Sequence, residues 1–466
     1  MNEAAIPVSG RQANPRRDMA AGVAILAVLF LGIAFWNGFP LMFYDTGAYL
    51  EQGLTGAFLV ERSPVYSFLL RFAGGGFSLW PVVILQSLMT ATMIALLARI
   101  EVPGLTLAGL VLIGLLLMTL TGIGWYVGQV EPDCMTALVV IGSYLLMFRL
   151  DRLERKPRWL VIGITGLCVA CHPSHLGLIA GLLLAGLGLK FFGRHLFIRV
   201  GPLLPRPALG PAAGACLLAV ALVLTSNLVL ARGLFLSRSG PVFVFARLMQ
   251  DGIIQRLLDE TCPESGYDLC PYRGRLPRNA NAWLWGENSL FHREGGFAKS
   301  QTEDERMIAD SLRRYPWMHL KAALYDSVLQ FFEFRTGDGI VSQETILWPT
   351  LKEDIPGQLS AYAGARQQTE TIRFETLNMI HVTIGMFSLL GLVLVLHQAL
   401  LRGRWNQAAL PGLVLLGLIG NAVICGTFAN PHDRYQSRLI WLPALVLLLR
   451  RAKNPALLHP DGESGT

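Results

Sequence analysis

Long runs of apolar residues, separated by short charged stretches, limit more than any other feature how this chain can fold. A transmembrane helix needs about 20 mostly apolar residues, because backbone polar groups in lipid must be hydrogen-bonded within the protein. About ten runs approach that length. They lie at 18–37, 78–99, 104–123, 134–149, 158–172, 174–192, 208–231, 377–400, 408–429 and 438–450. The pattern predicts an all-α polytopic membrane protein with about ten transmembrane helices.

The composition agrees with residence in a lipid bilayer. Of 466 residues, 53% are hydrophobic and only 15% are charged, which excludes an ordinary soluble domain of this length. The net charge of +7 needs no nucleic-acid partner, because the excess lies largely in loops beside the apolar runs.

Basic residues cluster at alternate ends of the runs. The clusters are Arg11, Arg16 and Arg17; Arg152, Arg155, Lys156 and Arg158; Lys190, Arg194 and Arg199; Arg402 and Arg404; and Arg450, Arg451 and Lys453. The positive-inside rule therefore predicts that both termini are cytoplasmic. Arginine far outnumbers lysine, which favours a bacterial source. We expect a bacterial inner-membrane protein whose remaining charged motifs face the periplasm.

The orientation depends on 158–192, which is broken at His172-Pro173-Ser174-His175. This stretch is either one interrupted helix or a hairpin of two helices. Both of its flanks are basic, which a hairpin explains and a single crossing does not.

Three blocks follow from these spans. Residues 1–231 form a seven-span module with a first outer loop at 38–77, residues 232–376 form a helical and irregular periplasmic domain, and residues 377–466 form a three-span module. Pro316 suits the first turn of a helix within the middle block. Cys262 and Cys270 lie eight apart there in a turn-rich stretch, which favours a disulfide over two free thiols or a metal site.

Acidic residues follow the first span and open the fourth. Asp45 and Tyr49 are four apart and would share one helix face. Asp45 is either a helix cap or an acid held near hydrocarbon, which would be a candidate base or ligand. Glu131 and Asp133 either complement a helix dipole or join Asp45 in an acidic pocket, where a divalent cation such as Mg or Mn could bind.

Arginines precede the last span, in His432-Asp433-Arg434-Tyr435-Gln436-Ser437-Arg438. The apolar run after Arg438 is about half the length that hydrocarbon requires, so Arg438 should lie below the membrane surface. It either snorkels to the headgroups or joins Arg434 in holding one anion, for which phosphate is the natural fit. His172 and His175 could share a metal, but a hydrogen-bonding role in a turn is more common.

Short motifs resemble those of polytopic GT-C glycosyltransferases. Asp45-Thr46-Gly47-Ala48-Tyr49-Leu50 and Glu61-Arg62-Ser63-Pro64-Val65-Tyr66 are similar to the family's first-loop pattern. Glu131-Pro132-Asp133 stands where a second acidic motif is often found, and His432-Asp433-Arg434-Tyr435 is similar to the C-terminal segment. Many members have two adjacent acids in the first loop, whereas Thr46 follows Asp45 here, which puts a two-acid metal site in doubt.

The resemblance implies transfer of a sugar from a polyprenyl-phosphate donor to a lipid, glycan or protein acceptor at the periplasmic face. It assigns Asp45 as the base and Arg62, Arg434 and Arg438 as contacts of the donor phosphate. Secondary or metal-binding acids would be Glu131 and Asp133, with Tyr49, His432 and Tyr435 in support.

Two other classes of protein stay open. A transporter or flippase of a lipid-linked glycan would place charges near the midplane within repeated halves, and no repeat is visible here. A noncatalytic envelope-assembly protein would use the same acids structurally.

Overall fold

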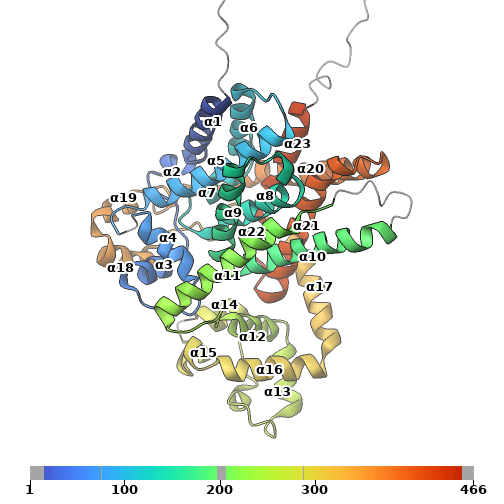
Figure 1. The fold of residues 1–466 in the computed structure, drawn as a ribbon. Helices are drawn as coiled ribbons and strands as arrows, with labels where there is room; N and C mark the ends of the chain where they lie inside the picture. The colour runs from blue at the N-terminus through green and yellow to red at the C-terminus, as the bar shows by residue number, and fades with distance from the viewer. Residues whose placement is uncertain (1–14, 75, 197–205, 287, 454–466) are drawn as a thin grey trace, which may run out of the picture.

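The computed structural model describes residues 15–74, 76–196, 206–286 and 288–453, and these ranges form helices with no β-strand. One isolated β-bridge joins Leu41 to Gln129. Six helical segments are long and apolar enough to span a membrane. They are Arg17–Asn37 (α1, Pro15–Phe30, with α2, Gly32–Asn37), α5 (Trp80–Glu101), α10 (Pro173–Leu196), α11 (Leu209–Ala231), α20 (Phe374–Leu401) and α21 (Trp405–Phe428). A multi-pass membrane protein is therefore the architecture that these residues support (Figure 1).

The remaining expected spans coincide with shorter helices. They are α6 (Leu107–Leu120), α8 (Met135–Phe148), α9 (Arg155–Ala170) and α23 (Trp441–Lys453). Because these helices have 13 to 16 residues, a count of ten crossings stays a prediction.

Helices α8, α9 and α10 alternate in direction. At one end, His175 near the start of α10 contacts the carbonyl of Cys168 near the end of α9, and it also contacts Thr136 near the start of α8, both at 2.7 Å. At the other end, Gly186 of α10 approaches Met147 at the end of α8. The chain therefore turns back at His172, as a hairpin requires and one interrupted helix does not allow.

Basic residues gather at the end of the bundle away from this turn. Arg149, which follows α8, pairs with Glu101 at the end of α5 at 2.6 Å and donates to the carbonyl of Asn406 near the start of α21. Both chain termini, Arg11 and Arg199 lie outside the described residues. Which side of the membrane this basic end faces stays a prediction.

The middle block divides between two hydrophobic cores. Residues 240–315, which we call the outer unit, have their own core around Phe245, Leu257 and Trp283. Its helices are α12 (Gly240–Gln250), α13 (Ile253–Thr261), α14 (Ala280–Trp285), α15 (Leu290–Arg293) and α16 (Gln301–Arg314). Leu347 and Tyr362, by contrast, join the core of the membrane bundle. The later part of the block therefore packs as a cover on the bundle.

That cover lies over the first outer loop. The loop contains α3 (Thr46–Thr55) and α4 (Pro64–Phe72), and the cover contains α18 (Glu344–Asp354) and α19 (Leu359–Ala363). Further short helices are α7 (Ile123–Val127), α22 (Asp433–Ser437), η1 (Pro132–Cys134), η2 (Leu150–Arg152), η4 (Cys270–Tyr272), η5 (Gly296–Ala298) and η6 (Pro356–Gln358). Gly47 of α3 approaches Leu347 of α18 so closely that a Cβ atom would lie 2.9 Å from its side chain. The fit fixes the loop that carries Asp45.

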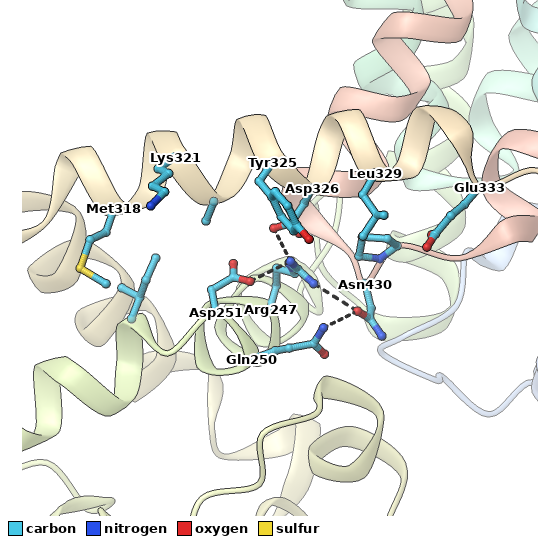
Figure 2. Close-up of a pocket in the computed structure, with 13 residues that line it drawn as sticks. Arg247, Gln250, Asp251, Met318, Lys321, Tyr325, Asp326, Leu329, Glu333 and Asn430 are labelled. Atoms are coloured by element: carbon cyan, nitrogen blue, oxygen red, sulfur yellow. Dashed lines mark hydrogen bonds and ion pairs between the residues drawn. The ribbon is translucent and has the colours of Figure 1, made fainter.

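Helix α17 (Pro316–Phe332) joins the outer unit to the bundle, and it starts at the proline that the sequence indicated. It packs along α21, where a Cβ atom on Gly426 would lie 2.6 Å from the carbonyl oxygen of Asp326. Arg247 of α12 bonds to Asp326 and pairs with Asp251 at 2.7 Å (Figure 2). The outer unit is thus attached to α17 through a buried ion-pair cluster.

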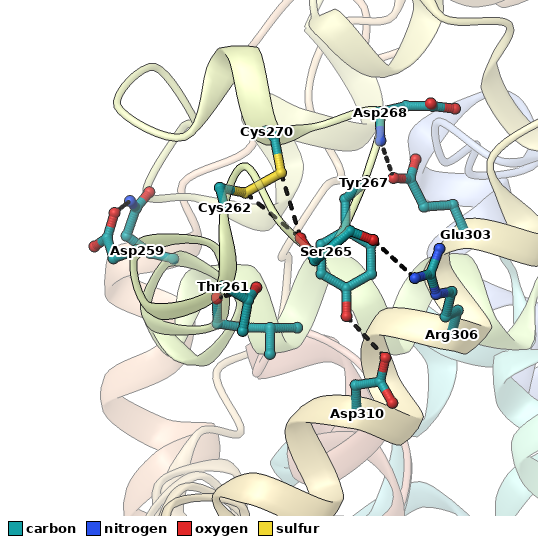
Figure 3. Close-up of a disulfide and its surroundings, with 12 residues drawn as sticks. Asp259, Thr261, Cys262, Ser265, Tyr267, Asp268, Cys270, Glu303, Arg306 and Asp310 are labelled. Carbon is teal, nitrogen blue, oxygen red and sulfur yellow. Dashed lines mark hydrogen bonds between the residues drawn. A yellow bond between two sulfur atoms is a disulfide. The ribbon is translucent and has the colours of Figure 1, made fainter.

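The predicted disulfide between Cys262 and Cys270 is present, with Cα atoms 5.5 Å apart (Figure 3). Its loop is held against α16, because the hydroxyl of Tyr267 donates to Asp310 at 2.8 Å and Arg306 donates to the carbonyl of Ser265. The bridge closes a short loop whose Tyr267 and Leu269 side chains are buried in the core of the outer unit.

Asp304 makes the stability of the outer unit depend on pH. Its side chain is buried in the first turn of α16, its Oδ2 atom has no hydrogen-bond partner among the described residues, and burial raises its pKa to about 8. A raised carboxyl pKa means that the folded state holds a proton which the unfolded chain releases near pH 4. Stability should therefore fall by about 1.4 kcal/mol per pH unit from about pH 4 to pH 8.

We expect Asp304→Asn to remove most of this slope. Hydrogen exchange of α16 in the full-length protein, corrected for intrinsic rates between pH 5 and 8, measures it. Glu305→Gln changes an exposed neighbour and is the matched control. A slope that persists unchanged in Asp304→Asn would assign the pH dependence to another group.

Candidate functional site

Three acids and three arginines meet where the first outer loop, the start of α8 and α22 come together. Arg62 pairs with Asp45 at 2.7 Å, and Arg438 pairs with Asp133 at 2.6 Å. Arg434 lies between the two pairs, 3.5 Å from Asp45. Asp45 and Arg434 are 389 positions apart in the chain, yet they line one cluster, which is the geometry that a shared site requires.

Asp45 is not a helix cap. It stands at the N-cap position of α3, but its side chain makes no capping hydrogen bond. Its two oxygens instead face Arg62 and Arg434. The side chain of Asp45 is 22% exposed, whereas those of the two arginines are 10% and 8% exposed. Asp45 is therefore the most accessible member of the trio.

Thr46 fixes the loop that carries Asp45. Its hydroxyl oxygen accepts a hydrogen bond from the backbone amide of Phe43 at 2.9 Å. The hydroxyl proton is shared between two acceptors, the carbonyl oxygen of Val130 at 3.0 Å and Oε1 of Glu131 at 3.2 Å. A second acid at position 46 would face the Glu131 carboxyl at this distance. The threonine therefore explains how the first loop can pack directly on the Glu131 segment.

Glu131 is buried and differs from the other two acids. Burial, together with nearby Asp45, raises its pKa well above the usual carboxyl value, although Arg434 opposes the shift. Asp45 and Asp133, by contrast, each pair with an arginine. Three guanidinium groups thus share two paired carboxylates among the described residues of the cluster.

Arg438 and Asp133 form a structural pair. Arg438 is fully buried and does not snorkel to the surface. Its guanidinium donates to Asp133 and, at 3.1 Å, to Asn421 of α21. Asp133 is likewise held by this contact and does not cap α8. The pair ties the last helix to the fourth apolar run.

Arg434 is less completely satisfied than Arg438. Its Nε atom is 3.7 Å from Asp133, and neither Nε nor Nη1 has a hydrogen-bond acceptor among the described residues. The guanidinium lies 3.8 Å from the ring centroid of Phe43 and 5.2 Å from that of Tyr435. A buried guanidinium with two unused donors lacks hydrogen-bond partners that an anion could supply, so it is well placed to bind one.

Arg62 connects the site to the outer unit. Its guanidinium lies 6.0 Å from the ring centroid of Tyr49 and 5.7 Å from that of Trp285 in α14. Tyr49 also packs edge-on against Tyr66. Sequence patterns gave no reason to connect Trp285 with this site, because the contact depends on how the outer unit docks.

His432 anchors the turn before α22. Its Nδ1 atom is 3.5 Å from Asp338, and its backbone exchanges two hydrogen bonds with the side chain of Gln330 in α17. Asp338 also accepts from the backbone amide of Arg434 at 3.2 Å. Asp338 was missed because it lies in an irregular loop. Asn421 could have been noticed as a polar residue inside an apolar run.

The His172 and His175 side chains make local hydrogen bonds. Ser174 contacts Nδ1 of His172 through its hydroxyl at 2.7 Å, and His175 bonds Thr136 and Cys168 as described above. Within the described ranges, no group of three or more His, Cys, Asp or Glu side chains is arranged to hold a metal ion. Asp45 and Asp133 are already paired with guanidinium groups, so these acids do not form a cation site as they stand.

Comparisons with protein-family models, curated proteins and solved structures give no match. The chemistry of the site therefore rests on its own residues. They provide an accessible carboxylate, a buried guanidinium with free donors, and a second guanidinium that contacts both the carboxylate and the outer unit.

Proposed function

We propose that this protein is a membrane glycosyltransferase of the GT-C type, which moves a sugar from a polyprenyl-phosphate donor to an acceptor at the periplasmic face of a bacterial inner membrane. The observation that carries the proposal is Arg434, a buried guanidinium with two unpartnered donors beside Asp45. Planar guanidinium groups match phosphate oxygens in charge and geometry, and no described residue occupies Nε or Nη1 of Arg434.

Binding of the donor would change the partners of Asp45. A phosphate placed against Arg434 and Arg62 competes with Asp45 for their donors, so the carboxylate would be released as the anion enters. Arg438 has a different role in this proposal, because Asp133 and Asn421 already occupy it. It holds Asp133 in place and leaves the direct phosphate contacts to the other two arginines.

The transfer step then follows from charge. The acceptor hydroxyl oxygen forms a bond to the anomeric carbon while the bond from that carbon to the phosphate oxygen breaks. The acceptor proton passes to Asp45, and polyprenyl phosphate leaves as an anion. Negative charge grows on the phosphate during this step, so fixed guanidinium groups stabilise the transition state more than the ground state.

The central test uses purified protein in lipid vesicles with a panel of labelled polyprenyl-phosphate sugars and cell-envelope acceptors. Sugar transfer supports the proposal. Movement of the donor across the bilayer without transfer would indicate a flippase, and neither activity would favour an assembly role.

We expect Arg434→Lys to raise the KM for the donor by roughly 10- to 100-fold, because a lysine cannot make the paired hydrogen bonds of a guanidinium to phosphate. Steady-state kinetics at varied donor concentration measures the change. Arg402→Lys, an exposed arginine at the basic end of the bundle, is the control. An unchanged donor KM in Arg434→Lys would remove Arg434 from the phosphate site.

A further inference from the structure

A cavity lies between α12 of the outer unit and α17, beside the Asn430-Pro431 segment that precedes α22. It has a volume of about 660 Å³, within the range of small-molecule sites. Its walls are α12, α17 and the Asn430-Pro431 segment. Figure 2 shows Lys321 and Tyr325 pointing from α17 toward Asp251 and Arg247 of α12.

The charged groups around this cavity nearly cancel. Arg247 and Lys321 are balanced by Asp251, Asp326 and Glu333. Arg247 pairs with both Asp251 and Asp326, so the charges of these two acids are partly neutralised within the wall of the cavity. Burial also raises the pKa of Asp251 to about 6 and raises that of Glu333. Neither an anion nor a cation would therefore be strongly selected here, in contrast to the arginine cluster.

The cavity is rich in groups that recognise hydroxyls. Arg247, whose side chain is 4% exposed, has an Nε atom without a hydrogen-bond partner among the described residues, and Oε2 of Glu333 is buried and equally unpartnered. The amides of Gln250 and Asn430 are joined by a hydrogen bond at 2.9 Å. Carboxyl, amide and guanidinium groups pair with vicinal hydroxyls through both of their polar atoms.

An aromatic ring completes the site. Tyr325 lines the cavity while 68% of its surface is exposed, so its ring is free to pack against the C–H face of a sugar. On a neighbouring face of α17, Trp317, Leu320, Leu324 and Val328 form an exposed apolar stripe that does not line the cavity. Helix α17 thus presents one apolar face and one face suited to a polar, uncharged ligand.

We infer that this cavity binds a neutral carbohydrate, and, resting on the proposed function, that it holds the glycan of the acceptor. Asn430 in its wall is followed closely by His432 and Arg434, and Gln330 of α17 holds the backbone of His432. A glycan seated here would lie beside the turn that presents Arg434. The acceptor is thereby positioned by uncharged contacts that do not compete with the donor phosphate.

The test is direct binding of fluorescently labelled neutral trisaccharides of glucose, mannose, galactose and N-acetylglucosamine to the full-length protein without donor. We expect saturable binding of at least one of them, and at least a tenfold loss of affinity in Tyr325→Ala. Trp317→Ala, which removes an exposed aromatic ring from the other face of the same helix, should bind normally. Because both side chains are largely exposed, neither variant should misfold.

Four results would overturn the inference: no binding by any neutral trisaccharide, equal binding in Tyr325→Ala, equal losses in both variants, or tighter binding of trigalacturonic acid. Asp45→Asn should retain trisaccharide binding, which separates this site from the transfer step. Sugar transfer without trisaccharide binding would contradict the assignment of the cavity but not the proposed transferase activity. Trisaccharide binding that depends on Tyr325, without any sugar transfer, would support the carbohydrate site and contradict the proposed glycosyltransferase activity.

Discussion

Asp45→Asn should lower the kcat of sugar transfer by about 10²–10⁴-fold, because asparagine cannot accept the acceptor proton. The donor KM should stay the same or fall. Removing the carboxylate leaves Arg62 and Arg434 without their shared partner, which makes the cluster more positive toward phosphate. Transfer kinetics with kcat and KM determined separately measure this split, which a merely structural role for Asp45 would not produce.

Glu51→Gln is the matched control for this variant, since it neutralises an exposed carboxylate on α3 without touching the cluster. Both variants should be recovered from membranes in amounts similar to the native protein. Transfer at the native rate by Asp45→Asn would eliminate this residue as the base, while leaving the phosphate role of the arginines to be judged on donor binding.

Asp133→Ala should destabilise the protein by about 3–5 kcal/mol, because it leaves the fully buried Arg438 without a counter-charge. The double variant Asp133→Ala/Arg438→Met should recover much of that loss, since an apolar side chain of similar length can fill the space. The folded fraction after heating in detergent, followed by size-exclusion chromatography, provides the measurement. Asp151→Ala, whose side chain is 75% exposed, should have little effect.

Stability and activity should separate in the double variant. If Arg438 only positions Asp133 and the last helix, the rescued protein regains its fold and retains donor affinity through Arg434 and Arg62. A loss of donor affinity in a fully folded double variant would instead return Arg438 to the phosphate site. A double variant as unstable as Asp133→Ala would show that the pair does more than neutralise a buried charge.

The apolar runs predicted the helices well, because hydrophobic length is a local property that lipid imposes on each segment. The break at His172-Pro173, the helix starting at Pro316 and the Cys262–Cys270 disulfide could also be predicted from neighbouring residues. The division of 232–376 between two cores could not, because it depends on how α18 packs against α3 and joins the core of the bundle.

The candidate site, like the fold, could be predicted only in part from the sequence. Charges set beside apolar runs identified Asp45, Glu131, Asp133, Arg434 and Arg438, because a charge near hydrocarbon needs a partner. Which acid meets which arginine was decided by tertiary packing. Arg438 was expected to share an anion with Arg434, but the fold places Asp133 and Asn421 against it. Asp338 and Trp285 gave no local signal at all.

The sequence by itself indicated a membrane protein and the positions of its apolar helices along the chain. It also indicated which charged residues lie close enough to hydrocarbon to require a partner. Only the tertiary structure decided that two donor atoms of Arg434 stay unpartnered among the described residues while Asp133 and Asn421 engage Arg438, and that a cavity opens between α12 and α17. The free energy of transferring a segment into lipid depends only on the residues of that segment, so it can be judged from the sequence. Pairing depends on side chains separated by hundreds of residues, and its geometry exists only once the helices have packed.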